Sequence, residues 1–126
     1  MKKTLRVAVV FIVMCAFTII PPKHDIVGRW ITYNTDGTIG YVDFAKDGSF
    51  KVTSTDGQLY HSGHYKLDND VFSVNDKEGC GDNYWGTYKF TFIGEDSIHV
   101  TAITDSCTGR REQITSGNSG IKRFKQ

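Results

Sequence analysis

The chain has 126 residues, with 15 Lys and Arg against 14 Asp and Glu. This even balance lacks the basic surplus of proteins that bind nucleic acid or anionic membrane surfaces, so we exclude nucleic acid as a partner. Without an export segment roughly 100 residues remain, which is the size of one domain with one core and leaves no room for a second.

The N-terminus has the pattern of an export segment. Basic residues up to Arg6 precede an uncharged run over 7–20, and Pro21 and Pro22 end it. About 14 apolar residues are short for a membrane span and typical of a secretory signal. We therefore expect residues 1–22 to be a signal peptide or membrane anchor, the only membrane contact, and 23–126 to be an exported domain in the periplasm, cell envelope or medium. Cleavage, lipidation at Cys15 and an uncleaved anchor all stay open.

The rest of the chain alternates short β-prone runs with turn residues such as Asp36-Gly37, Asp47-Gly48 and Asp56-Gly57. Because Asp-Gly accommodates the backbone of tight hairpins, the pattern predicts strands that each pair with the next. The predicted strands are 26–33, 39–45, 49–54, 58–67, 71–75, 85–93, 97–104 and 121–125. The segment 110–116 fits either a short strand or a helical turn.

About eight hairpin-linked strands predict an all-β domain, a single antiparallel up-and-down barrel, because closing the sheet removes its two exposed edges. Such a barrel is either filled by side chains or holds one small ligand. We expect it to be a monomer.

The hairpin over 84–106 defines a register. With its turn centred on Glu95, the pairs are Phe92 with Ile98, Phe90 with Val100 and Tyr88 with Ala102. These three apolar pairs share one face, so that face is predicted to lie in the core.

Cys80 and Cys107 remain once Cys15 is assigned to the export segment. An even pair in a chain bound for an oxidising compartment predicts a disulfide. It would join the open end of the hairpin to the preceding loop.

Two groups of residues resemble known proteins. Gly28-Arg29-Trp30 in the first strand, with Lys122 and Arg123 in the last, resembles the lipocalin arrangement. That resemblance implies that Trp30 closes one end of the barrel and that a basic side chain lies over its ring. The chain is shorter than classical lipocalins and lacks their later loop motifs.

The second resemblance begins at Gly86-Thr87-Tyr88 and continues in the run from Asp105 to Arg110, Asp-Ser-Cys-Thr-Gly-Arg. It is similar to a pattern in small exported lipocalin-like (calycin-type) proteins of bacteria. That family has no assigned activity, so the resemblance implies fold and export and leaves function open.

A ligand is expected among the inward side chains Phe50, Tyr65, Tyr88 and Phe90, because strand alternation turns them to the same side. Arg110 or Arg111 is expected at the mouth, where guanidinium groups bind acidic ligands. The competing interpretation is an Asp105–Arg pair that fixes a turn, or a solvated charge at the rim.

Metal and catalytic motifs are weak. His61 and His64 are three apart in a strand and point to opposite faces, so we expect no metal site and no cofactor. No nucleophile motif or phosphate-binding loop is present, which makes an enzyme the least favoured interpretation.

We therefore weigh three functions. The first is a barrel that binds a small apolar or amphipathic ligand in a cavity of a few hundred Å³. The alternative is an interaction or inhibitor domain with a filled core that uses a long loop over 76–84. The third is an enzyme built in the barrel, which the fold allows.

Overall fold

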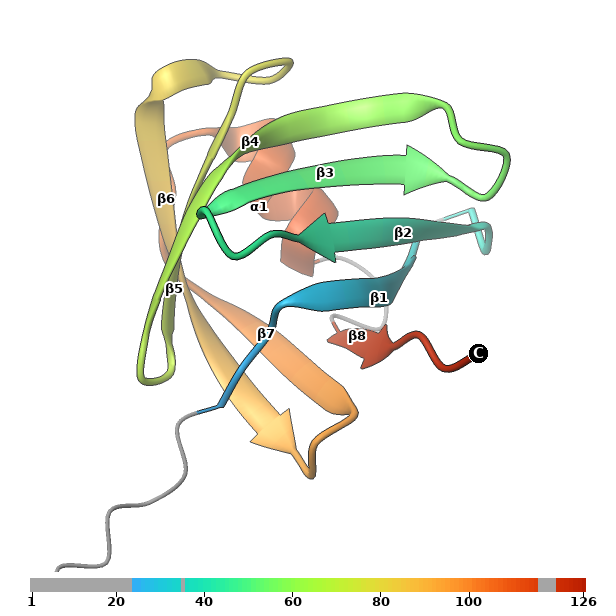
Figure 1. Cartoon of the computed structure of the whole chain (residues 1–126). Helices are drawn as coiled ribbons and strands as arrows, with labels where there is room; N and C mark the ends of the chain where they lie inside the picture. The colour runs from blue at the N-terminus through green and yellow to red at the C-terminus, as the bar shows by residue number, and fades with distance from the viewer. Residues whose placement is uncertain (1–23, 35, 116–119) are drawn as a thin grey trace, which may run out of the picture.

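The computed structural model describes residues 24–34, 36–115 and 120–126, so the expected export segment lies outside the described residues. Within them, eight antiparallel strands follow one another around a closed barrel, and one short helix precedes the last strand (Figure 1). The elements are β1 (Gly28–Tyr33), β2 (Ile39–Phe44), β3 (Ser49–Ser54), β4 (Leu59–Asp68), β5 (Val71–Asp76), β6 (Gly81–Ile93), β7 (Ser97–Thr104), α1 (Thr108–Thr115) and β8 (Gly120–Arg123). The prediction of an all-β antiparallel barrel is confirmed.

Asp side chains fix the turns between the first strands. Asp47 accepts hydrogen bonds from the Ser49 amide (2.9 Å) and hydroxyl (2.6 Å), and Gly48 has a φ of 85°. Asp36 binds the amide and hydroxyl of Thr38 in the same way. These local bonds explain why the Asp-Gly pairs mark hairpins in the sequence.

The predicted hairpin register is confirmed. Phe92 pairs with Ile98, Phe90 with Val100 and Tyr88 with Ala102 across β6 and β7. The barrel closes where β1 pairs with β8, with Trp30 opposite Arg123.

Two parts of the chain differ from simple expectation. The prediction of a long loop over 76–84 is wrong. β6 begins at Gly81, which pairs with Asp76, so only residues 77–80 connect β5 and β6. The ambiguous segment after Cys107 is helical, as α1. Among the described residues, no helix is long and apolar enough to cross a membrane.

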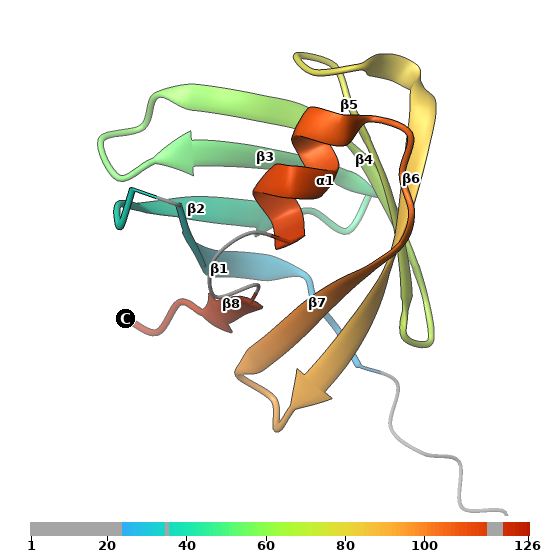
Figure 2. The same cartoon turned by 180° about the vertical axis from the view of Figure 1, so that it is seen from behind.

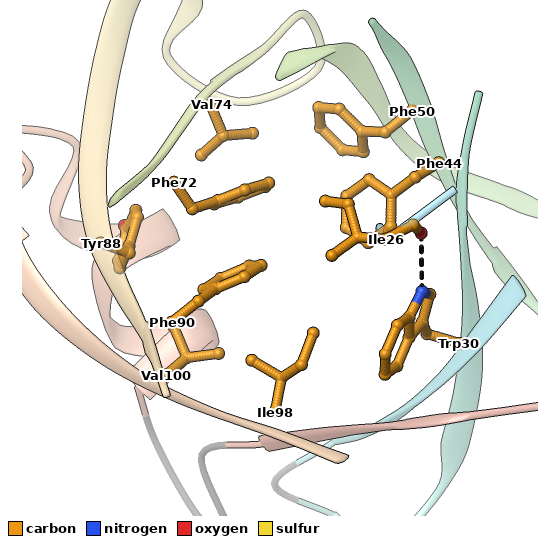
Figure 3. Close-up of a cluster of buried hydrophobic side chains, with 10 residues drawn as sticks. All are labelled: Ile26, Trp30, Phe44, Phe50, Phe72, Val74, Tyr88, Phe90, Ile98 and Val100. Carbon is orange, nitrogen blue, oxygen red and sulfur yellow. Dashed lines mark hydrogen bonds between the residues drawn. The ribbon is translucent and has the colours of Figure 1, made fainter. Parts of the chain in front are cut away.

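The core lies inside the barrel, and Trp30 belongs to it. Figure 3 shows ten buried side chains: Ile26, Trp30, Phe44, Phe50, Phe72, Val74, Tyr88, Phe90, Ile98 and Val100. Trp30 is fully buried and its indole N–H donates to the Ile26 carbonyl at 2.8 Å. Phe72 and Phe90 stack with their ring centroids 4.2 Å apart.

A cation lies over the buried indole, as the lipocalin resemblance implied. The Arg123 guanidinium carbon is 4.3 Å from the centre of the Trp30 ring, while Lys122 is exposed. Gly28 has a φ of 121°, and a Cβ there would lie 3.8 Å from Arg123. Positive φ favours glycine, so Gly28 lets the chain enter β1 beside this cation. We call this closed part the Trp30 end.

Candidate functional site

The interior of the barrel is not completely filled. A cavity of about 140 Å³, here called the inner cavity, lies towards the end opposite Trp30. Its apolar lining comes from six strands and α1: Val42, Phe44, Phe50, Val52, Phe72, Val74, Phe90, Val100, Ile114 and Ile121. The lining can therefore enclose the apolar part of a small molecule.

Polar residues gather where the helix crosses the barrel. In Figure 2, α1 is drawn in front of β2 and β3, and its residues Gln113 and Ile114 line the inner cavity. An open cleft of about 660 Å³, the outer cleft, lies beside the cavity and shares Asn34, His61 and Gln113 with it. The inner cavity thus meets the outer cleft at a polar junction beside α1.

The inner cavity ends on a buried ion pair. Arg110 donates from Nε to Asp105 Oδ2 at 2.7 Å and from Nη2 to Asp105 Oδ1 at 2.8 Å. The Tyr88 hydroxyl also donates to Oδ2, and the Cys107 amide donates to Oδ1 at 2.9 Å. The side chain of Asp105 is completely buried and that of Arg110 is 5% exposed. Four donors therefore hold one carboxylate beneath the first turn of α1.

These contacts determine the charge of the cluster. Burial alone would raise the pKa of Asp105, but the hydrogen bonds from Arg110, Tyr88 and the Cys107 amide together lower it below its usual value. Burial and the hydrogen bond to Asp105 raise the pKa of Tyr88 far above that of a free tyrosine. The cluster at neutral pH is an ionised Asp105, a charged Arg110 and a neutral Tyr88, with a net charge of zero.

The rest of the second sequence pattern supports this cluster. A Cβ at Gly86 would lie 2.3 Å from Asp105 Oδ2, so only glycine leaves room for the carboxylate. Cys107 forms the predicted disulfide with Cys80, with the two Cα atoms 5.9 Å apart. The bond ties the start of α1 to the connection between β5 and β6. Each of these residues therefore holds the ion pair or the chain around it.

A second polar pair, His61 and Asp76, joins β4 to the end of β5. His61 Nδ1 is 3.0 Å from Asp76 Oδ2, close enough for an ion pair, but the two atoms form no hydrogen bond of acceptable geometry. Asp76 Oδ1 accepts from the amides of Glu78 and Gly79, both at 3.1 Å. Asp76 is thus fixed by the turn that follows it, and His61 lies between it and the outer cleft.

Two buried nitrogens of the site have no hydrogen-bond partner among the described residues, His61 Nδ1 and Arg110 Nη1. Nη1 of Arg110 is buried and makes no hydrogen bond to any described residue, and Arg110 lines the inner cavity. Buried donors are almost always paired in folded proteins, so such a group is a sign of a missing water or ligand.

The structure separates the predicted ligand residues. Phe50, Phe90 and Arg110 line the inner cavity, whereas Tyr65, Tyr88 and Arg111 do not. Tyr65 donates its hydroxyl to the Ala45 carbonyl at 2.7 Å, nearer the Trp30 end, and Arg111 is exposed. A molecule in the inner cavity is therefore expected beside the first three. The Asp105–Arg110 pair also forms, as the competing interpretation anticipated.

Other lining residues were not singled out from the sequence as ligand contacts. Phe44 and Phe72 belong to the predicted strands, and their alternation with polar neighbours was the available signal. Asp76 and Gln113 had no such signal, because the end of β5 and the helix set their positions. Across the described residues, no three His, Cys, Asp or Glu side chains gather in a group that could hold a metal ion.

Comparison of the chain with models of protein families, with curated proteins and with solved structures found no match.

Proposed function

We propose that the protein is an exported, lipocalin-like barrel that binds one small amphipathic molecule in the inner cavity. The observation that carries the proposal is the cavity itself, an apolar space of about 140 Å³ that ends on a buried arginine with one unpaired donor. Pockets of this composition, mostly apolar with a few convergent polar groups, are typical of small-molecule sites.

The size of the space limits the ligand. Sites for drug-sized molecules measure roughly 300–1,000 Å³, and an engineered apolar cavity of about 150 Å³ binds benzene. The inner cavity is thus smaller than the few hundred Å³ expected from the sequence, and its lining contains four phenylalanines and Tyr33 but neither Tyr65 nor Tyr88. A molecule with a body of about one ring fits this space.

Export agrees with the disulfide. Cys80 and Cys107 are bonded in the structure, and such bonds persist in oxidising compartments. The disulfide also holds α1, which covers the cavity, to the β5–β6 connection. The disulfide is therefore compatible with export and supports the helix that covers the proposed ligand site.

The interaction hypothesis loses the surface on which it relied. It placed its contacts on a long loop over 76–84, and most of those residues belong to β5 and β6. We therefore favour the binding function.

A cavity-filling variant tests the proposal. Val100→Phe places a larger side chain in the cavity and so reduces its free volume. Thr101→Phe introduces the same side chain on the exposed outer face of β7. Toluene and benzamide serve as probes, measured by calorimetry and ligand-observed NMR. We expect wild type and Thr101→Phe to bind at least one probe and Val100→Phe to bind neither.

Near-ultraviolet circular dichroism checks that each variant is folded, and Ile121→Phe is a second filling variant. Binding that survives in folded Val100→Phe and Ile121→Phe, or no binding to wild type, would contradict the proposal.

A further inference from the structure

The unpaired Arg110 donor limits the chemistry of the ligand. Two of the guanidinium nitrogens, Nε and Nη2, are bound to Asp105, and Nη1 is the nitrogen left without a partner in a residue that lines the inner cavity. A guanidinium donates and never accepts hydrogen bonds. The group that fills this place must therefore carry an oxygen or another acceptor atom. A toluene-like hydrocarbon would leave the donor buried and unpaired.

The charge around the site disfavours an anion. Asp105 already neutralises Arg110 through two hydrogen bonds. Asp76 lines the inner cavity, and Asp36 and Glu112 line the outer cleft. Among the described residues that line the two spaces, Arg110 is the only Lys or Arg. A carboxylate would thus approach further carboxylates without gaining a free cation.

An ammonium group does not fit either. It would be attracted by the acidic outer cleft, but it carries no acceptor for Arg110 Nη1. Inside the cavity its charge would also face the guanidinium at close range, where burial reduces screening by water. The head group that suits both the donor and the surrounding charges is a neutral one with an exposed oxygen.

We propose that the inner cavity selects an uncharged molecule with a body of about one aromatic ring and a carbonyl or amide oxygen, which accepts a hydrogen bond from Arg110 Nη1. This inference rests on the binding function proposed above. It replaces the acidic ligand expected from the sequence, because Arg110 already has a carboxylate partner. The phenylalanines Phe44, Phe50, Phe72 and Phe90 surround the ring.

Four probes that share one ring separate the possibilities at pH 7. Benzamide is neutral with an oxygen acceptor, toluene has no acceptor, benzoate is an anion and benzylamine is a cation. We expect benzamide to bind about tenfold more tightly than each of the others, the gain expected from one buried hydrogen bond. Calorimetry gives the dissociation constants, and the NMR resonance of the Arg110 side chain reports contact.

A matched pair of variants tests the role of Nη1. Arg110→Lys keeps a cation beside Asp105 and removes the second donor arm, whereas Arg111→Lys makes the same change at the exposed neighbour. We expect benzamide affinity to fall to that of toluene in Arg110→Lys, with toluene affinity unchanged, and to stay at the wild-type value in Arg111→Lys. If Arg110→Lys does not fold, the wild-type ranking decides.

The outcomes are distinct. Equal binding of benzamide and toluene, as when an ordered water satisfies Nη1, would overturn the head-group inference and leave the binding function standing. Tighter binding of benzoate or benzylamine would do the same. Failure of all four probes to bind would contradict the binding function itself.

Discussion

Tyr88 donates its hydroxyl hydrogen bond to Asp105 across 17 residues of sequence, and both side chains are buried. The bond joins the middle of β6 to the segment between β7 and α1, so it couples the barrel wall to the chain that leads into the helix covering the cavity. The ion pair with Arg110 holds the other side of the same carboxylate.

Tyr88→Phe should lower the free energy of unfolding by about 1.5–3 kcal/mol, because a hydrogen bond to a buried charge is lost. Urea unfolding measures the change. Tyr84→Phe is the control on the same strand, since Tyr84 is 56% exposed and should change stability by less than about 0.5 kcal/mol. Equal effects of the two substitutions would mean that the Tyr88–Asp105 bond contributes little.

The pH dependence of stability should also report on Asp105. Its pKa in the folded protein is lower than in the unfolded chain, where an Asp titrates at about 3.9. The unfolded state therefore takes up the proton first as the pH falls, so this stabilisation is complete above about pH 5 and is lost towards the folded pKa.

Urea unfolding of wild type and Asp105→Asn from pH 7 to pH 3 tests this dependence. The stability difference between them should be largest above about pH 5 and should shrink as the pH falls. Exposed carboxyls such as Asp36 and Asp47 are present in both proteins and cancel. A difference that stays constant over this range would contradict the assignment.

Removal of the disulfide should destabilise the protein. The two cysteines are 27 residues apart, and the chain-entropy model gives about 3.5 kcal/mol for a loop of that size. The double variant Cys80→Ser and Cys107→Ser, unfolded in urea, provides the measurement. Hydrogen exchange should also speed up in α1, because the bond anchors the start of the helix. Unchanged exchange there would show that the Asp105–Arg110 pair suffices.

Trp30→Ala should cost about 3–5 kcal/mol of stability, the usual range for a fully buried large aromatic. Arg123→Met should cost at least about 0.5–2 kcal/mol, because it removes the cation over the indole and the hydrogen bond from Nη2 to the Asp25 carbonyl, whereas exposed Lys122→Met should have little effect. Thermal and urea unfolding compare the three variants. A loss below about 1 kcal/mol for Trp30→Ala would show that this ring does not stabilise the closed end.

The sequence predicted most of the barrel because its signals are local. Asp47-Gly48 forms a turn through bonds to the next residues, and the alternation around Phe90 sets the register of β6 and β7. The start of β6 was missed because Gly81 follows the run Gly79-Cys80 and reads as part of a turn. Its pairing with Asp76, a contact in three dimensions, makes it a strand.

The site was less predictable because it depends on distant contacts. Arg110 appears in a polar helix with no apolar periodicity, and only its pairing with Asp105 and Tyr88 turns it inward. Tyr88 has the inward parity that predicts a ligand contact, yet its hydroxyl is directed to Asp105 instead. His61 and Asp76 meet across two strands with register shifts, which no pattern in the sequence specifies.

The most direct test of the binding function is a titration with benzamide, and in parallel with toluene, followed by the methyl NMR resonances of valine. Val74 and Val100 line the inner cavity, whereas Val71 lies on β5 outside its lining and is 37% exposed. We predict saturable shifts of the Val74 and Val100 methyl groups together with the Arg110 side chain, and no comparable shift of Val71. Shifts confined to Val71 and other exposed methyl groups, or no saturable shift with either benzamide or toluene, would contradict a ligand site in the barrel.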